Sequence, residues 1–228
     1  MKYQILVLDL DGTLTNSKKQ ITEPTLRALI EIQEAGKKVV LASGRPTQGV
    51  APLAKQLHLD KYGSYILSFN GARIIDCRTG DLIYNKTLPP EVTVPIYDVC
   101  KNYRADMLSY GQNDLISAFT PNKYTKLESC INHMPIRHVE DFCGYVSAYP
   151  NNKFLLTGEP EEIAGIQKVL IRHFRSLLNI YCSDPFFLEI MPRKIDKAYS
   201  LQRLLNSIGL TADEMICCGC LLYTSRCV

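Results

Sequence analysis

The feature that most constrains this chain is a short apolar run near its start that leads directly into two acidic residues. Residues 5–8 are aliphatic throughout, which is typical of a strand buried on both faces of a parallel sheet. Asp9 and Asp11 follow with one residue between them, and Gly12 then provides a turn residue with unusual backbone freedom. In open α/β sheets, ligands bind just beyond the carboxyl ends of the strands, so we expect a site at this point.

The pair Asp9 and Asp11 is compatible with two kinds of chemistry. Two carboxylates at a strand end can hold a hard divalent cation such as Mg2+, which prefers oxygen ligands. One carboxylate can also act as a nucleophile and the other as a general acid or base. An Asp-x-Asp pair by itself is often only a solvated turn, and its place behind a buried strand is what favours a site.

A second polar corner follows the next predicted strand. The pattern predicts a helix over 22–36 and a strand over 37–42, which form a strand–helix–strand unit with a parallel crossover. Ser43, Gly44 and Arg45 follow that strand, where a hydroxyl and free backbone amides can bind an anion. The alternative is a plain strand-to-helix turn in which Ser43 caps the next helix, predicted over 47–59.

A third predicted strand, 65–69, ends in Asn70 and Gly71, and Asn-Gly is a strong turn signal that needs no function. Residues 73–77 and 82–85 then predict a hairpin.

These features resemble the haloacid dehalogenase (HAD) superfamily of phosphotransferases, in its Cof-type branch, HAD-IIB. The first motif, Asp-x-Asp-Gly-Thr, is matched in full by residues 9–13, and Ala-Ser-Gly-Arg at 42–45 has the form of the second motif. The resemblance implies that Asp9 is a nucleophile that forms an aspartyl-phosphate. It implies that Asp11 protonates the leaving group and then activates water, and that Ser43 hydrogen-bonds the transferring phosphoryl group.

The same resemblance implies roles for further residues. Those on the substrate side are Gly12, Gly44, Arg45 and Asn70. Asp9 and Asp11 are implied to hold Mg2+. The third motif is a lysine, for which Lys197 is the matching position and Lys194 the rival; without the family, a lysine at a helix start reads as a solvated surface residue.

The domain organisation expected from the pattern is an α/β, Rossmann-like parallel-sheet core interrupted by an inserted α+β cap. We expect residues 1–85 to form the first part of the core, 86–185 the cap and 186–219 the second part of the core. Helices are expected over 92–103 and 161–178 within the cap, together with several short strands. In the Cof-type branch such an insertion is a lid that excludes water and selects the substrate.

The sequence departs from the family pattern at its end. The family places Gly-Asp-Gly-x-Asn-Asp after Gly219, where further acids complete the Mg2+ site, but this chain has Cys220 at the first acidic position. A thiolate is a poor ligand for Mg2+. The hypothesis is that 220–228 are not native, that the core is incomplete at its C-terminus, and that this chain has little activity.

Composition and charge give no support to several other classes of protein. The formal charge is +3 over 228 residues and is spread along the chain, which gives no argument for nucleic acid or an anionic membrane as a partner. No apolar run is long enough to span a bilayer, and no obligate protein partner is indicated. A cleaved leader would remove the strand that precedes Asp9, so we expect a cytoplasmic protein.

The function predicted from the sequence is a Mg2+-dependent phosphomonoester hydrolase of small phosphorylated metabolites such as sugar phosphates. A phosphomutase of the same fold is one alternative, since it uses the same pair of acids. A non-catalytic, ligand-binding remnant of the fold is the other, because the fourth motif is lost.

Overall fold

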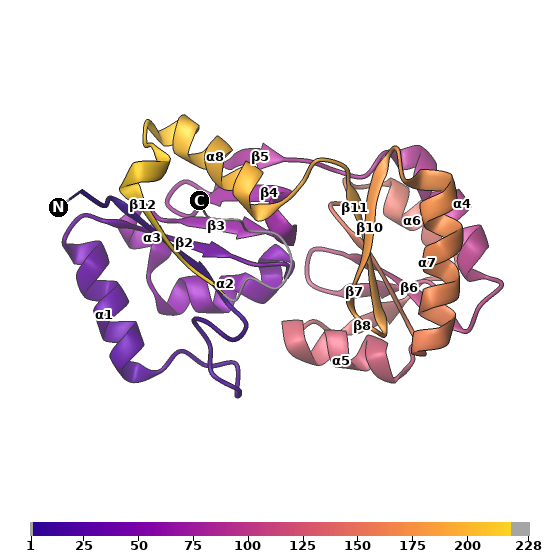
Figure 1. Cartoon of the computed structure of the whole chain (residues 1–228). Coiled ribbons are helices and arrows are strands. Elements are labelled where there is room, and N and C mark those ends of the chain that lie inside the picture. Colours follow the sequence, from indigo (N-terminus) through magenta and orange to yellow (C-terminus); the bar gives the residue numbers. More distant parts are fainter. Residues whose placement is uncertain (1, 220–228) are drawn as a thin grey trace. The chain divides into compact units, whose positions relative to one another are not determined.

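The computed structural model describes residues 2–219 (Figure 1). They form two compact units: the first joins the residues up to Asn85 to the segment that begins at Ile195, and the second is Lys86–Lys194. The second unit is therefore inserted into the sequence of the first. No helix in the described part of the chain is long and apolar enough to cross a membrane.

The first unit is built on a sheet whose strand order, among the described residues, is β12-β1-β2-β3-β4-β5. Its strands are β1 (Ile5–Asp9), β2 (Lys38–Ala42), β3 (Tyr65–Ser68), β4 (Arg73–Asp76), β5 (Leu82–Asn85) and β12 (Met215–Cys218). The strands from β12 to β3 run parallel, and β4 and β5 are added antiparallel. Asp9 pairs in register with Ala42, so the loops that follow β1 and β2 leave the same edge of the sheet.

Helices cover both faces of this sheet. The helices are α1 (Glu23–Glu34), α2 (Thr47–Gln56), α3 (Leu59–Tyr62) and α8 (Lys197–Ile208), with 3-10 turns η1 (Phe69–Gly71) and η3 (Ala212–Glu214). Successive side chains of a strand point to opposite faces. Leu41 accordingly packs with Leu29 and Leu53 on the face of α1 and α2, whereas Val40 packs with Leu204 of α8. Figure 1 shows α8 on the opposite side of the sheet from α1. The α/β fold expected from the sequence is confirmed.

Two local expectations differ in detail from the structure. The helix expected over 47–59 is interrupted, because His58 adopts a left-handed φ of 53° between α2 and α3. The helix expected over 22–36 spans Glu23–Glu34, because Thr22 is extended; the Thr22 hydroxyl is bonded to the Thr25 hydroxyl at 2.9 Å and caps no backbone N–H.

The second unit is an α+β structure around its own sheet. Its strands are β6 (Ala105–Tyr110), β7 (Leu115–Ser117), β8 (Ile136–His138), β9 (Phe154–Gly158), β10 (Leu178–Asp184) and β11 (Phe187–Pro192), in the order β10-β11-β9-β6-β7-β8. Its helices are η2 (Pro90–Val92), α4 (Thr93–Cys100), α5 (Lys123–Asn132), α6 (Phe142–Ser147) and α7 (Pro160–Phe174). One face of the sheet packs against α4, α6 and α7 in a core that includes Met107, Leu156 and Ile166.

The expected second boundary of the inserted unit is wrong. The sequence places 186–219 in the first unit, but β11 pairs antiparallel with both β9 and β10. The boundary therefore follows Lys194. The error has a physical cause: an apolar strand looks the same in the sequence whichever of two sheets it joins, and only its pairing assigns it.

Helix α5 and helix α6 were not expected from the sequence. The buried residues of α5 are Thr125, Glu128 and Asn132, so this helix has no apolar stripe that a periodicity could reveal. Its start is fixed by Asn122, whose side chain accepts hydrogen bonds from two backbone N–H groups of the first turn.

The polar face of α5 is matched by a buried carboxylate on β6. Asp106 is fully buried and accepts hydrogen bonds from Ser117 Oγ at 2.7 Å, Thr125 Oγ1 at 2.9 Å and the Phe119 backbone N–H at 2.9 Å. Burial raises the pKa of Asp106, and these hydrogen bonds oppose part of that rise. Since Asp106 and Met107 alternate along the strand, α5 lies against the face opposite to the apolar core.

Asp106→Ala should destabilise the protein by about 1–3 kcal/mol, because it leaves buried donors without an acceptor. Urea denaturation measures the change. The matched control is Asp98→Ala, which removes an exposed carboxylate paired with Lys101 and should change stability by less than about 0.5 kcal/mol. Equal effects of the two substitutions would contradict this account of Asp106.

Candidate active site

The acidic loop is a compact turn at the end of β1. Asp9 is the last residue of the strand, and its carbonyl accepts a hydrogen bond from the Leu14 N–H at 3.1 Å. The Leu10 carbonyl accepts both the backbone N–H and the hydroxyl of Thr15, each at 3.0 Å. Gly12 has a φ of +78°, a conformation that a side chain would disfavour. These bonds hold the loop beyond the edge of the sheet, with Asp9 and Asp11 in it.

Asp9 forms an ion pair with Lys197, the first residue of α8. The distance from Lys197 Nζ to Asp9 Oδ1 is 2.6 Å, and the exposed fractions of the two side chains are 19% and 21%. Asp196 caps the helix by accepting the Tyr199 N–H at 2.7 Å. Of the two candidate lysines, Lys197 is therefore the one that contacts Asp9, whereas Lys194 is exposed and belongs to the second unit.

Asp11 is held by two cations. Arg45 binds both of its oxygens, with Nη2 at 2.6 Å from Oδ1 and Nε at 3.0 Å from Oδ2, and Lys19 Nζ lies 2.7 Å from Oδ1. Burial alone would raise the pKa of Asp11, but the hydrogen bonds and charges of Arg45 and Lys19 outweigh it and hold that pKa below its ordinary value. Asp11 is thus an ionised carboxylate in this arrangement.

Lys19 is a site residue that the sequence reasoning missed. It stands in the polar loop after the acidic motif and has a left-handed φ of 59°. A basic residue in a polar loop is usually solvated. Lys19 pairs with Asp11 only because the loop folds back toward that carboxylate. The one available signal was its short distance along the chain from Asp11.

Ser43 is buried in the corner after β2. Its exposed fraction is 2%, and its Oγ accepts the Arg45 N–H at 3.1 Å. The residue before α2 is Pro46, so Ser43 does not cap that helix. Within the described residues Ser43 Oγ donates no hydrogen bond to protein, which leaves its O–H for a bound group.

Gly44 and Asn70 approach each other closely. A Cβ on Gly44 would lie 2.9 Å from Asn70 Oδ1, so any larger residue would displace the amide. Asn70 adopts a left-handed φ of 53°, and its backbone N–H donates to the Ser43 carbonyl at 2.9 Å. The loops after β2 and β3 are thereby tied together, and the structure brings Ser43, Gly44, Arg45 and Asn70 into one corner.

The donor chemistry of the acidic loop fits Mg2+. Asp9 and Asp11 both carry hard carboxylate oxygens. Asp9 Oδ2 makes no hydrogen bond to the residues described here, whereas the Asp11 carboxylate would have to release Arg45 before it could bind a metal ion. In 2–219 there is no group of three or more His, Cys, Asp or Glu that could hold a metal ion, so these two acids would need water or substrate oxygens to complete a shell. A Cβ on Gly219 would lie 3.3 Å from Asp9 Cβ, so β12 ends beside Asp9; Cys220 lies outside the described residues.

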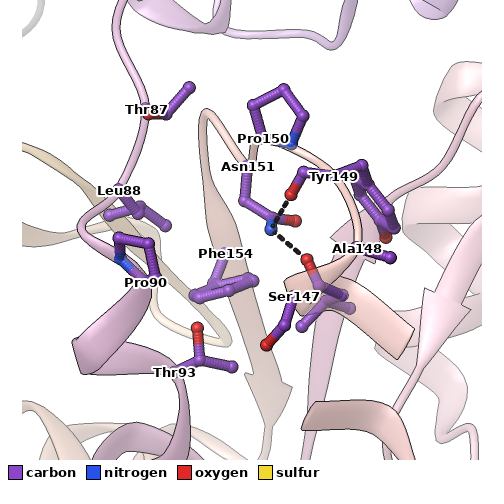
Figure 2. A pocket seen from close by; sticks show the side chains of 11 residues that line it. Thr87, Leu88, Pro90, Thr93, Ser147, Ala148, Tyr149, Pro150, Asn151 and Phe154 are labelled. Carbon is purple, nitrogen blue, oxygen red and sulfur yellow. Dashed lines mark hydrogen bonds between the residues drawn. The ribbon is translucent and has the colours of Figure 1, made fainter. Parts of the chain in front are cut away.

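A separate cavity lies wholly within the second unit. It has a volume of about 300 Å³ and is formed by side chains from 87–93 and 146–154, which Figure 2 shows around an opening above Phe154. Two hydrogen bonds from Asn151 to the carbonyls of Val146 and Tyr149 shape one wall. None of its lining residues is charged, so it offers no carboxylate to bind a metal ion and no basic side chain to bind a phosphate.

The fold and the acidic loop define a hydrolase of the haloacid dehalogenase type. The model of the haloacid dehalogenase-like hydrolases matches residues 6–219. A solved haloacid dehalogenase-like hydrolase from Bacteroides thetaiotaomicron is 39% identical, with a TM-score of 0.92, over 95% of this chain and 81% of that one. A Streptococcus pyogenes protein named as a candidate phosphatase is 28% identical over 222 residues, 96% of this chain and 81% of that protein.

A solved sugar phosphatase of HAD subclass IIB shares the fold, with a TM-score of 0.75 and 18% identity over 94% of this chain and 79% of its own. This chain belongs to the haloacid dehalogenase-like hydrolase family, as its first three motifs predicted.

Arg45→Met should raise the pKa of Asp11, because it removes a bidentate partner while burial, which favours the neutral acid, remains. A carboxyl with a lowered pKa stabilises the fold above its unfolded pKa, and this contribution is lost as the pH falls through the folded value. The variant should therefore lose stability near neutral pH and show a flatter acid transition. Carboxyl carbon NMR in metal-free protein measures the pKa.

The control for that experiment is Arg27→Met, which removes an exposed ion pair with Glu23. It should leave the Asp11 titration unchanged. An Asp11 pKa that stays at its parent value in Arg45→Met would show that Arg45 does not set it.

Proposed function

We propose that this chain is a Mg2+-dependent phosphomonoester hydrolase that works through an aspartyl-phosphate on Asp9. The observation that carries the proposal is the placement of Asp9 at the carboxyl end of β1, with Lys197 Nζ at 2.6 Å from one of its oxygens. The family match over residues 6–219 and the phosphatase names of its relatives support it.

In the first step an Asp9 carboxylate oxygen attacks phosphorus, and the bond from phosphorus to the ester oxygen breaks. Asp11 supplies the proton that the departing alkoxide needs. In the second step water attacks the same phosphorus, Asp11 takes the proton of that water, and Asp9 leaves as a free carboxylate together with inorganic phosphate. The first half-reaction leaves Asp9 phosphorylated and Asp11 without its proton, and the second returns both residues to their starting states.

The contacts of Asp11 suit the second step of the reaction better than the first. Its chelation by Arg45 and its lowered pKa suit the second step, in which it accepts a proton. Protonation of a leaving group requires Asp11 to release Arg45 and gain a proton first. Substrate phosphate oxygens are natural competitors for the Arg45 guanidinium, which binds carboxylate and phosphate alike.

Three groups are positioned to stabilise the transferring phosphoryl group. Lys197 supplies a point positive charge next to Asp9, which offsets repulsion between the carboxylate and phosphate. Ser43 Oγ can donate its proton to a phosphoryl oxygen, because it acts toward Arg45 only as an acceptor. Mg2+, held by Asp9 and Asp11, would supply further charge neutralisation.

The substrate class we propose is a small phosphorylated metabolite such as a sugar phosphate. The inserted unit 86–194 is proposed as the cap that selects it. The test compares the 228-residue chain with a version in which an acidic fourth motif follows Gly219, each with and without Mg2+. Inorganic phosphate released from sugar phosphates by neither form would overturn the proposal and favour a ligand-binding remnant.

In the version with an acidic fourth motif, Asp9→Asn should reduce turnover to the background of the assay while leaving the fold intact, since the carboxamide is nearly isosteric but cannot form the phosphoanhydride. The matched control is Asp60→Asn, an exposed acid on α3, which should keep parent activity. Phosphate release by Asp9→Asn near the parent rate would remove Asp9 from the role of nucleophile.

Asp11→Asn should slow alkyl phosphates by about 10²–10⁴-fold, the usual contribution of a general acid. Aryl phosphates with good leaving groups should lose less, because their departing oxygens need no proton. Steady-state kinetics on one substrate of each type measures the difference. Equal losses on both would restrict Asp11 to a structural or metal-holding role.

A further inference from the structure

The turn after β3 has an unusual backbone. Phe69, Asn70 and Gly71 adopt φ values of 50°, 53° and 98° in succession. Glycine takes such values readily, but a bulky residue such as Phe69 does so only with backbone strain. A conformation of this kind persists only where its surroundings hold it in place.

On one side the turn is held by the loop that carries the second motif. The Phe69 N–H donates to the Arg45 carbonyl at 2.9 Å, and the Asn70 N–H donates to the Ser43 carbonyl at 2.9 Å. The backbone of the loop that carries Ser43, Gly44 and Arg45 is therefore fixed to the strained turn at two consecutive residues.

On the other side the turn is held by helix α8. Ser200 is fully buried, and its Oγ donates to the Gly71 carbonyl at 2.8 Å. A Cβ on Gly71 would lie 2.5 Å from Ser200 Oγ and 3.0 Å from the Asp196 carbonyl, so the first turn of α8 packs directly on the turn's backbone. Only glycine at position 71 allows this approach.

Ser200 stands three residues after Lys197, and residues at this spacing lie on neighbouring positions of one helix face. The same helical turn that is bonded to Gly71 thus presents Lys197 to Asp9. We propose that Ser200 is a positioning residue: its bond to Gly71 fixes the first turn of α8 and thereby holds the Lys197 ammonium on Asp9.

The strained turn is thus bonded both to the first turn of α8 and to the loop that carries Ser43. It therefore holds these two segments in a fixed position relative to each other. The consequence for catalysis rests on the proposed phosphatase function, but the placement of Lys197 does not. A small displacement of a charged group from its productive position can cost a large factor in rate. Ser200 acts through Lys197 and touches no reacting atom.

The first arm of the test measures how accessible the Lys197 amine is, and it requires no assay of enzyme activity. The parent, Ser200→Ala and Ser207→Ala are treated with trace amounts of an amine-acylating reagent, and mass spectrometry follows the labelling rates of Lys197 and of the exposed Lys55. Ser207 is the matched control, because its Oγ also bonds a backbone carbonyl, that of Leu204, near the far end of α8. Ser200→Ala should label Lys197 about threefold to tenfold faster, the effect of one lost hydrogen bond.

Ser207→Ala should leave the Lys197 rate at the parent value, and Lys55 should be unchanged in all forms. Ser200→Cys, which keeps the size and a weak donor, should give an intermediate rate and replaces the alanine variant if that one does not fold. A Lys197 rate that stays at the parent value in both Ser200 variants overturns the inference, whatever their activity.

The second arm is a double-mutant cycle on kcat with Lys197→Met. Ser200→Ala should lower kcat about tenfold in the parent and have no further effect in the Lys197→Met background, because the two residues act through one group. Additive losses would overturn the inference. Absence of phosphate release in every form, the fourth-motif version included, would overturn the proposed function instead, and the labelling arm would still decide the role of Ser200.

Discussion

The ion pair between Lys197 and Asp9 is the interaction on which the candidate site depends. It joins residues 188 positions apart, across the whole inserted unit, and both side chains are about four-fifths buried. Breaking a pair of this kind leaves an uncompensated charge in a place of reduced solvation, which is costly. The pair therefore requires α8 to return to the sheet beside β1, and the Gly71–Ser200 contact is what fixes that return.

The second carboxylate of the site, Asp11, is also paired with cations. Asp11 is balanced by Arg45 from the second loop and by Lys19 from its own loop, so each acid has its own cation. Because cations are distributed around both carboxylates, a phosphate that enters the site finds partners already in place. The two-sided helix layers supply rigidity, and the chemistry resides in loops that all leave one edge of the sheet.

The second unit shows which helices and strands local sequence patterns can predict and which they cannot. Helices α4 and α7 and most of its strands could be predicted, because their apolar periodicity reflects the core they bury. Helix α5 could not, since Thr125, Glu128 and Asn132 are buried polar residues and the acceptor Asp106 lies on a different element. Strand β11 could not be assigned to a sheet for a similar reason. Its apolar side chains would suit either sheet, and only its pairing with β9 and β10 assigns it to the second unit.

The sequence by itself determined the strand–loop–helix order of the first unit and the residues that its motifs name. Asp9, Asp11 and Ser43 are set by short-range patterns, because an apolar strand followed by polar turn residues has a local signature. The tertiary structure alone decided which lysine meets Asp9, that Lys19 joins Asp11, and that Ser200 bonds Gly71. Those contacts form only when the chain has folded and the sheet and its helices have packed. Local sequence patterns therefore cannot predict them.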